Sequence, residues 1–343
     1  MAIYSPPQTD PRHAFRKIPG GNTIDPILLI LLGAGAYVGW NIGANDTANC
    51  IGTSVGCGLL SFKRAVFLVA VFTILGAMLQ GQYVMKTIGK GIVREDLNYT
   101  AIIVALLCSG FFVTLATFFK IPTSTSQAVV GGVFGIGLAV GADINYSKFA
   151  IIAESWLICP VLVMVLAFVL SHLLNYIVRK VALSTLLIQN TIGWMAIISA
   201  CYVAYGTGAN NAGNAVGPIA NLGIIDPTLL LLIGGIAIAV GAITYGKKVA
   251  QTVGKGITPL DIPAAFVAQF SSAFGLHLFS VLGIPVSTSS AIVGAVVGVG
   301  LVKGAKAISK KTVITILFGW ILTPCSAAVS SFVLYKALVM LTG

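Results

Sequence analysis

The amino-acid sequence predicts an all-α integral membrane protein with two homologous repeats, broken helices and re-entrant hairpins. The first observation is composition: of 343 residues, 57% are apolar and only 8% are Asp, Glu, Lys or Arg. A soluble domain carries about a quarter of its residues as charged side chains, so this chain cannot face water on all sides. The second observation is that apolar segments of about 20 residues, the length of a membrane-spanning helix, recur along the chain. The third is that three motifs each occur twice.

The charge pattern indicates contact with lipid. The chain has 20 Lys and Arg against 9 Asp and Glu, a formal charge of +11. Its basic residues stand singly or in short clusters between apolar segments, where the positive-inside rule expects them, so we expect a lipid bilayer and no nucleic acid as partner. The best candidate for a cytoplasmic loop carries Lys303, Lys306, Lys310 and Lys311.

Catalytic and metal-binding motifs are missing from the sequence. The six cysteines form no CxxC pair and have no His/Cys ligand spacing, and we interpret them as small buried side chains. The sequence contains no nucleophile elbow, phosphate-binding loop or zinc-protease motif. We therefore expect no cofactor and no enzymatic activity.

The elements are predicted in chain order from the apolar segments. Residues 1–24 are polar and have no apolar stretch of their own, so they are predicted to form a tail rather than a signal peptide. Eight longer stretches are predicted to span the bilayer: 26–43, 62–82, 99–119, 148–170, 186–205, 227–246, 262–283 and 313–341. Stretches interrupted by Gly, Asn, Ser or Pro are predicted to form half-helices or re-entrant hairpins, at 46–60, 122–141, 209–222 and 285–302.

The repeated motifs occur in the same order in both halves of the chain. GANDTAN at 43–49 returns 165 positions later as GANNAGN, and TIGKGI at 87–92 returns at the same offset as TVGKGI. IPTSTS at 121–126 returns 163 positions later as IPVSTS. Three matched blocks indicate a duplication, with repeats at 25–170 and 184–343 and a linker at 171–183. Paired broken segments at corresponding positions are typical of secondary transporters, whose substrates bind near the bilayer midplane.

The first pair of motifs predicts a cation site. Asn, Asp and Thr supply oxygen ligands, and Gly allows backbone carbonyls to join them, which suits a hard cation such as Na⁺. Asp46 is the principal candidate because an ionisable group inside a membrane segment is costly and marks a functional site. The alternatives are that Asp46 caps a helix and that the asparagines only hydrogen-bond between helices. The predicted cation ligands are Asp46, Asn49, Asn211 and Asn214.

The two IP-x-STS motifs predict an anion site. Proline begins a helix there, so the hydroxyl groups lie beside free backbone N–H groups, and helix N-termini attract anions. The alternative, that Ser and Thr only cap two half-helices, is compatible with this interpretation. The predicted anion ligands are Ser124, Thr125, Ser126, Ser287, Thr288 and Ser289.

Three other charged residues have no firm assignment from the sequence. Lys90 and Lys255 stand in the repeated T-x-GKG segment, where they either draw anions toward the site or anchor a helix end at the lipid headgroups. Glu154 lies in an apolar segment and has no counterpart in the matched blocks.

Taken together, the motifs resemble the inorganic phosphate transporter (PiT) family. The resemblance rests on GANDTANCIGTSVG at 43–56, GANNAGNAVGP at 208–218 and the pair IPTSTS and IPVSTSSAIVG, and it extends over nearly the whole chain beyond 1–24. It implies a cation-coupled anion symporter built from inverted repeats, with hairpin tips around the anion, and commonly a homodimer. It also implies that Asn45 and Asn210 join the tip hydroxyls as anion ligands.

The sequence departs from the family pattern at three positions. Asn211 stands where the family's second signature carries Asp, and Thr73 and Gln269 stand where many members carry Glu. Some relatives are sulfate permeases. Hydrogen phosphate still bears a proton that a carboxylate accepts, whereas sulfate prefers donors only, so Asp46 favours phosphate and Asn211 leaves sulfate open.

We therefore expect a secondary active transporter that imports inorganic phosphate across the plasma membrane as a multi-pass protein. The coupling ion is expected to be Na⁺ or H⁺. A sulfate permease of the same fold is the alternative, and an ion channel is a more distant one.

Overall fold

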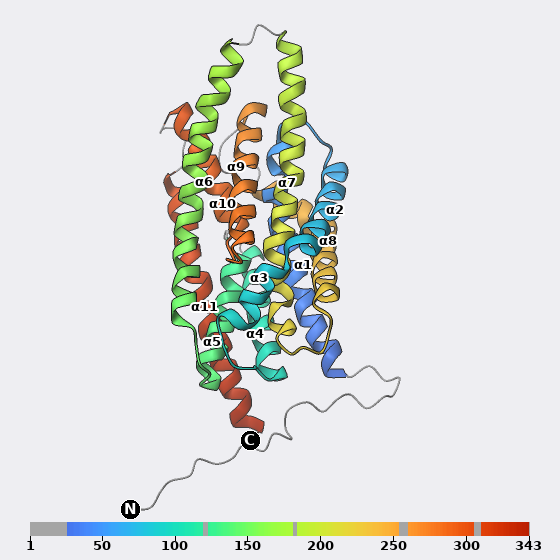
Figure 1. The fold of residues 1–343 in the computed structure, drawn as a ribbon, viewed down its shortest axis with the longest axis vertical. Helices are drawn as coiled ribbons and strands as arrows, with labels where there is room; N and C mark the ends of the chain where they lie inside the picture. Colours follow the sequence, from blue (N-terminus) through green and yellow to red (C-terminus); the bar gives the residue numbers. More distant parts are fainter. Residues whose placement is uncertain (1–25, 119–122, 181–183, 254–259, 305–309, 343) are drawn as a thin grey trace, which may run out of the picture.

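The structure, a computed structural model, is a bundle of helices (Figure 1). It describes residues 26–118, 123–180, 184–253, 260–304 and 310–342; the predicted tail at 1–24 lies outside them. Within these residues, the β-structure is a single bridge between Val93 and Ile144. The helices are α1 (Pro26–Gly56), α2 (Phe62–Gln80), α3 (Gln82–Lys86), the π-helix η2 (Thr87–Gly91), α4 (Tyr99–Phe118), α5 (Thr125–Val140), α6 (Tyr146–Lys180), α7 (Thr185–Ala220), α8 (Pro227–Val253), α9 (Ile262–Val281), α10 (Thr288–Lys303) and α11 (Lys310–Thr342).

The apolar segments form the predicted membrane helices. Within the described residues, eight helices are long and apolar enough to cross a membrane: α1, α2, α4, α6, α7, α8, α9 and α11. Two shorter apolar helices, α5 and α10, have 16 residues each and begin at the IP-x-STS motifs. The prediction of an all-helical protein with eight spans is therefore confirmed.

The predicted breaks near Asn45 and Gly208 are wrong, because α1 and α7 are continuous through both signature motifs. Glycine lowers helix propensity, but neighbouring helices that pack closely on it compensate in a membrane protein. Thr47 also donates a hydrogen bond to the carbonyl of Gly43 one turn earlier, which keeps the hydroxyl satisfied within the helix. The glycines of these motifs therefore serve close packing and not a helix break.

The helix α6 also continues beyond its predicted end. Residues 171–180, most of the segment predicted as a linker, form its last turns. Apolar residues recur through these turns, and Arg179 and Lys180 stabilise the negative end of the helix dipole. The side chain of Ser184 then caps α7 by accepting a hydrogen bond from the backbone N–H of Leu187.

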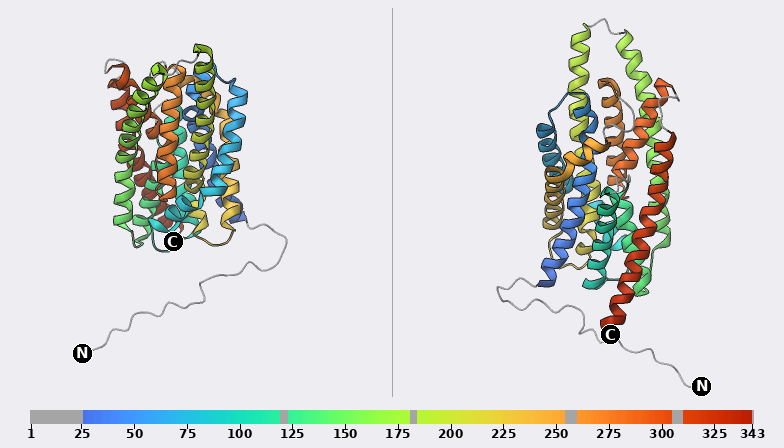
Figure 2. Two further views of the ribbon diagram at one scale, coloured as in Figure 1. Left: turned by 45° about the horizontal axis from the view of Figure 1, so that its top comes forward. Right: turned by 180° about the vertical axis from the view of Figure 1, so that it is seen from behind.

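Two helical hairpins extend into the molecule from opposite ends. In Figure 1, α4 and α5 lie in the lower half, whereas α9 and α10 lie in the upper half. The long helices α1, α6 and α8 run upward, and α2, α7 and α11 run downward (Figures 1 and 2). The hairpin tips meet, since the hydroxyl of Ser126 lies 2.9 Å from the carbonyl of Val286.

The helices α1, α2, α7 and α8 form one closely packed bundle. A β-carbon on Gly43 would overlap the backbone carbonyl of Ile238 on α8, and one on Gly241 would overlap that of Trp40 on α1. Such contacts replace the hydrophobic effect as the source of helix association in lipid, because backbones that touch gain van der Waals contact. Glycine at these positions brings α1 and α8 together.

The remaining long and short helices form a second bundle around the hairpins. The half-helix α5 packs on α11, and α10 packs on α6. In each case a glycine of the half-helix, Gly131 or Gly294, touches the carbonyl of a proline inside the long helix, Pro324 or Pro160. Each half-helix therefore packs on a long helix that belongs to the other half of the chain.

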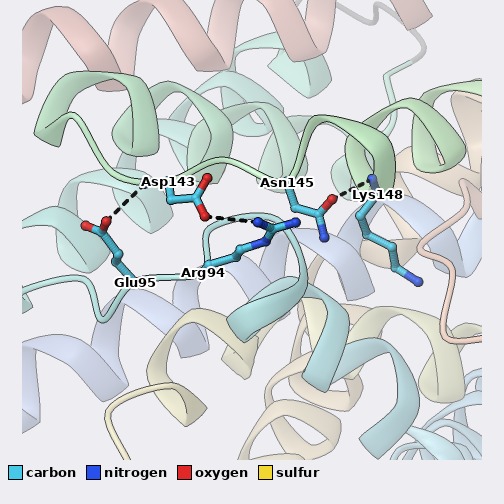
Figure 3. A network of polar contacts seen from close by, with 5 residues as sticks. All are labelled: Arg94, Glu95, Asp143, Asn145 and Lys148. Carbon is cyan, nitrogen blue, oxygen red and sulfur yellow. Dashed lines mark hydrogen bonds and ion pairs between the residues drawn. The ribbon is translucent and has the colours of Figure 1, made fainter.

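A network of charged residues closes the lower end of the first hairpin (Figure 3). Arg94 pairs with Asp143 at 3.0 Å, and Glu95 accepts a hydrogen bond from the backbone N–H of Asp143. The backbone N–H of Arg94 also donates to the carbonyl of Asp143. These bonds tie the segment after η2 to the connection between α5 and α6.

The packing of α1 on α8 gives a testable prediction. Gly43→Ala should destabilise the protein by about 1–3 kcal/mol, because the new methyl group overlaps a backbone carbonyl and forces the helices apart. Gly33→Ala in the same helix is the control, since its β-carbon would meet no atom within 4 Å. Thermal unfolding of the purified protein in detergent measures both, and equal midpoints for the two variants would contradict the packing argument.

Candidate functional site

A layer of polar side chains lies between two apolar clusters of the core. One cluster of buried apolar side chains lies in the lower half of the molecule and the other in the upper half. On α1 the lower cluster ends at Ile42 and the upper one begins at Cys50. On α7 the upper cluster ends at Ala204 and the lower one begins at Ala212. The first signature motif fills the interval on α1, whereas the second begins within the interval on α7 and extends past Ala212, so their polar groups lie where the two clusters meet.

Asp46 is the central group of this layer. Its side chain is 5% exposed. Its Oδ2 accepts a hydrogen bond of 3.0 Å from the Nδ2 of Asn211, and its Oδ1 accepts one of 3.3 Å from the Nδ2 of Asn49. No Lys or Arg among the described residues forms an ion pair with it. A buried carboxylate held only by neutral donors retains the capacity to bind a cation or a proton.

Asn211 joins Asp46 to both hairpin tips. Its Nδ2 also donates to Oγ1 of Thr288 at 3.0 Å. Its Oδ1 lies 2.8 Å from the hydroxyl of Ser126 and accepts a 3.0 Å hydrogen bond from Asn214. All hydrogen-bonding capacity of this amide is thus used within the layer.

The contacts between signature motifs and hairpin tips cross from one half of the chain to the other. Asn49 in the first half donates to the hydroxyl of Ser289 in the second, at 2.9 Å. Asn214 in the second half donates to the hydroxyl of Ser126 in the first, also at 2.9 Å. The predicted cation ligands Asp46, Asn49, Asn211 and Asn214 therefore lie together, in contact with three of the predicted anion ligands.

Two of the tip serines are helix caps. The hydroxyl of Ser124 accepts a hydrogen bond from the backbone N–H of Gln127, and that of Ser287 accepts one from Ser290. Ser124 and Ser287 therefore cap helices, as the alternative interpretation of the motifs expects, and these bonds fix the first turns of α5 and α10. The positive ends of two helix dipoles consequently lie at the polar layer.

Several polar atoms at this level are buried and have no hydrogen-bond partner. They include Oγ1 of Thr125, the hydroxyl of Ser290, and Oδ1 of Asn214. A buried polar atom without a protein partner is rare and is available to bond a water molecule, an ion or a substrate. The hydroxyls can donate to an anion, whereas Oδ1 of Asn214 can only accept and so suits a cation. Ser290 was not predicted from the sequence, although it directly follows the repeated motif.

The two asparagines expected to bind the anion do not join the network. Asn210 instead holds the second hairpin tip: its Nδ2 donates to the carbonyl of Ile284 and to Ser280, and its Oδ1 accepts from the backbone N–H of Val286 at 3.1 Å. Asn45 is half-buried and forms none of these bonds. Offsets between repeats identify matching positions, but they do not reveal which side of the helix each side chain occupies.

The other polar residues singled out from the sequence lie outside the layer. Lys90 is exposed and pairs with Asp96 at 3.3 Å, and Glu154 is exposed on α6. Lys255 lies outside the described residues. Gln269 is buried, donates to the carbonyl of Cys50 and accepts from Ser54, while Thr73 donates to the carbonyl of Ala204. No group of three His, Cys, Asp or Glu side chains in the described residues is arranged to hold a metal ion.

A polar layer sealed between apolar clusters, inside a bundle of membrane-length helices, is typical of a carrier for small ions. Comparison with known proteins specifies the family. The sequence profile of the phosphate transporter family matches residues 42–331, most of the chain. The chain therefore belongs to the phosphate transporter family, which is a family of transporters and not of enzymes.

Individual proteins agree with this assignment. A protein of Pyrococcus furiosus that carries the name of a phosphate permease is 30% identical, over 93% of this chain and 98% of its own length. Inorganic phosphate transporter 2-1, chloroplastic, of Arabidopsis thaliana is 27% identical, over 84% of this chain and 68% of that protein. A solved structure, described as "The sodium-dependent phosphate transporter", superimposes with a TM-score of 0.85 at 28% identity, covering 92% of this chain and 100% of that one.

The contacts of Asn210 give a prediction about the hairpin tip. Asn210→Ala leaves the backbone N–H of Val286 without its acceptor, at a cost of about 1–3 kcal/mol for the buried bonds lost. Amide hydrogen exchange at Val286 should then accelerate roughly 5- to 140-fold. Asn45→Ala is the matched control at the corresponding position and should leave this amide protected. Equal exchange in the two variants would show that Asn210 does not hold the tip.

Proposed function

We propose that this protein is a secondary active transporter that imports inorganic phosphate across the plasma membrane together with Na⁺. The observation that carries the proposal is the buried Asp46, which contacts Asn49 and Asn211 and through them both hairpin tips. A cation at this carboxylate and an anion at the tips would neutralise each other, so neither would bind as well alone. This mutual dependence is the physical basis of symport.

The anion proposal rests on the start of α5 and α10. Two helix N-termini converge there, and the unpartnered hydroxyls of Thr125 and Ser290 are available as donors. Asp46 adds an acceptor, which suits an anion that still carries a proton. Phosphate meets this requirement near neutral pH and sulfate does not. The relatives described above are also named for phosphate.

The cation proposal rests on two acceptors. Asp46 provides the charge, and the unpartnered Oδ1 of Asn214 provides a neutral oxygen in the same network, since both residues are hydrogen-bonded to Asn211. The similar transporter of known structure is described as sodium-dependent, which favours sodium over a proton here. Asn211 carries no charge, so we propose that Asp46 alone balances the coupling cation among these ligands.

The proposed mechanism is movement of the hairpin bundle against the bundle of α1, α2, α7 and α8. The opposite directions of α1 and α7, and the entry of the two hairpins from opposite ends, support an arrangement of inverted repeats (Figure 1). In such transporters one bundle rocks against the other around a fixed central site. The bonds from Asn49 to Ser289 and from Asn214 to Ser126 join the two bundles and would reform in each state. A homodimer, as the family resemblance implies, is part of the proposal.

Uptake of radiolabelled phosphate into proteoliposomes tests the function. We expect accumulation above the external concentration when Na⁺ is higher outside, and little without that gradient. A proton gradient and labelled sulfate serve as parallel conditions. Uptake driven by the proton gradient alone would show that H⁺, and not Na⁺, is the coupling ion. Uptake of sulfate in preference to phosphate would show that sulfate is the substrate. Equilibration without accumulation would indicate a channel.

The role of Asp46 is tested in the same assay. Asp46→Asn should reduce Na⁺-driven uptake to the background of empty liposomes, because the amide cannot balance a cation. Glu154→Gln is the control, since this carboxylate is exposed on α6 and lies outside the network. Both variants should elute as folded protein on size exclusion. Normal uptake by Asp46→Asn would show that this carboxylate is not part of the transport site.

Import also requires that the protein has a defined orientation in the membrane. The basic residues of the folded chain lie toward its two ends, and their numbers at each end indicate this orientation. We propose that the upper end in Figure 1 faces the cytoplasm, because the positive-inside rule places the larger number of Lys and Arg on that side and, among the described residues, the upper end carries more of them than the lower end. Helix ends in the upper half carry Lys63, Arg64, Arg179, Lys180, Lys303, Lys310 and Lys311. The segments at the lower end carry Lys86, Lys90, Arg94, Lys148 and Lys336.

Cysteine labelling measures this orientation. In a background without native cysteines, Thr228→Cys at the start of α8 should react with a membrane-impermeant maleimide in intact cells. Ser184→Cys at the start of α7 should react only after lysis. Both residues are exposed, so reactivity reports the side of the membrane. The reverse pattern would invert the proposed orientation.

A further inference from the structure

A groove of about 1360 Å³ lies away from the polar layer, between the first half of α2 and the first half of α7. Its outer rim is open: Phe67 and Trp194 expose 66% and 67% of their surface. Ile262, at the start of α9, also lines the groove.

The lining of the groove changes from polar to apolar along its length. Lys63, Arg64, Gln189 and Asn190 line the end where α2 and α7 begin. Apolar and aromatic side chains line the remainder as far as Tyr205, about 24 Å along α7 from Gln189. Trp194 lies next to the polar end, as expected for an aromatic side chain at a membrane interface.

The polar end carries an uncompensated positive charge. Lys63 and Arg64 are exposed, and neither forms an ion pair with a described residue. None of the residues that line the groove is Asp or Glu. At the lower end of the molecule, by contrast, Lys90 and Arg94 are paired with carboxylates. A ligand of this groove therefore has an anionic group at one end and an apolar body.

We propose that the groove is a binding site for one anionic phospholipid, with its phosphate at Lys63 and Arg64 and an acyl chain along α2 and α7. Arg forms bidentate hydrogen bonds with phosphate, and Lys adds a second charge. The length of the apolar part matches a chain that reaches from the interface toward the middle of a bilayer whose hydrocarbon core is about 30 Å thick. A zwitterionic lipid supplies the same chains but no net negative charge.

The position of the groove gives the lipid a connection to the polar layer. Tyr205, at its inner end, lies on α7 one turn before the signature motif, and its carbonyl touches Gly76 of α2. A chain wedged between these helices supports the spacing on which that contact depends. Lipid binding in the groove does not depend on which anion the protein transports.

Native mass spectrometry of the full-length protein in detergent tests the proposal. The probes are dioleoyl phosphatidylglycerol and dioleoyl phosphatidylcholine, which differ only in the headgroup. We expect the wild type to retain one phosphatidylglycerol more tightly than phosphatidylcholine. In Lys63→Gln/Arg64→Gln its affinity should fall roughly 25-fold, about fivefold for each charge removed, while the affinity for phosphatidylcholine should not change.

Two further variants separate the groove from general surface charge. Arg179→Gln/Lys180→Gln removes an equal charge at the end of α6, outside the groove, and should bind phosphatidylglycerol as the wild type does. Ile198→Trp narrows the apolar part and should reduce retention of both lipids with Lys63 and Arg64 intact.

Three outcomes would overturn the proposal. The first is that the wild type binds the two lipids with equal affinity. The second is that the α6 control loses as much affinity for phosphatidylglycerol as Lys63→Gln/Arg64→Gln does. The third is that the wild type is a dimer without bound lipid and that Lys63→Gln/Arg64→Gln dissociates this dimer. The last of these would assign the groove to a second copy of the chain.

Discussion

The whole arrangement depends on one buried carboxylate that has no basic partner among the described residues. An acidic side chain at the centre of a membrane helix costs about 2.5–3.5 kcal/mol on insertion scales, so its environment must compensate. Here the compensation comes from amide donors on α1 and α7, and these reach Asp46 only because the two signature helices and both hairpin tips converge at one level. The close helix packing by glycine and the capped half-helices are the structural requirements of that convergence.

The same interactions connect parts of the molecule that are held together in different ways. The bundle of α1, α2, α7 and α8 is held by backbone contacts, whereas the hairpins are held against α6 and α11. Between them, the polar layer offers a small number of hydrogen bonds among side chains of similar chemistry. Such bonds exchange partners at little net cost, which is compatible with the movement proposed above.

The sequence predicts which polar residues lie together better than what each of them contacts. Matched motifs identified Asp46, Asn211 and the tip hydroxyls, which the structure brings into contact, because polar groups within apolar segments are conspicuous and their repetition is not accidental. The prediction of helix breaks was wrong, since glycine inside a helix indicates close packing as readily as a break, and only the neighbouring helix decides. The motifs also do not reveal that Asn210 holds the second hairpin tip or that Ser290 has an unpartnered hydroxyl, because both depend on neighbours from other elements.

The crossed packing of the half-helices makes the two halves of the chain depend on each other. Gly131 of α5 packs on Pro324, and Gly294 of α10 packs on Pro160, so neither half contains the long helix on which its own half-helix packs. A chain cut between α6 and α7 would leave each fragment with a half-helix whose packing surface lies on the other fragment. Because α11 follows α5 by most of the second half of the chain, α5 can reach its final packing only after that half has been synthesised.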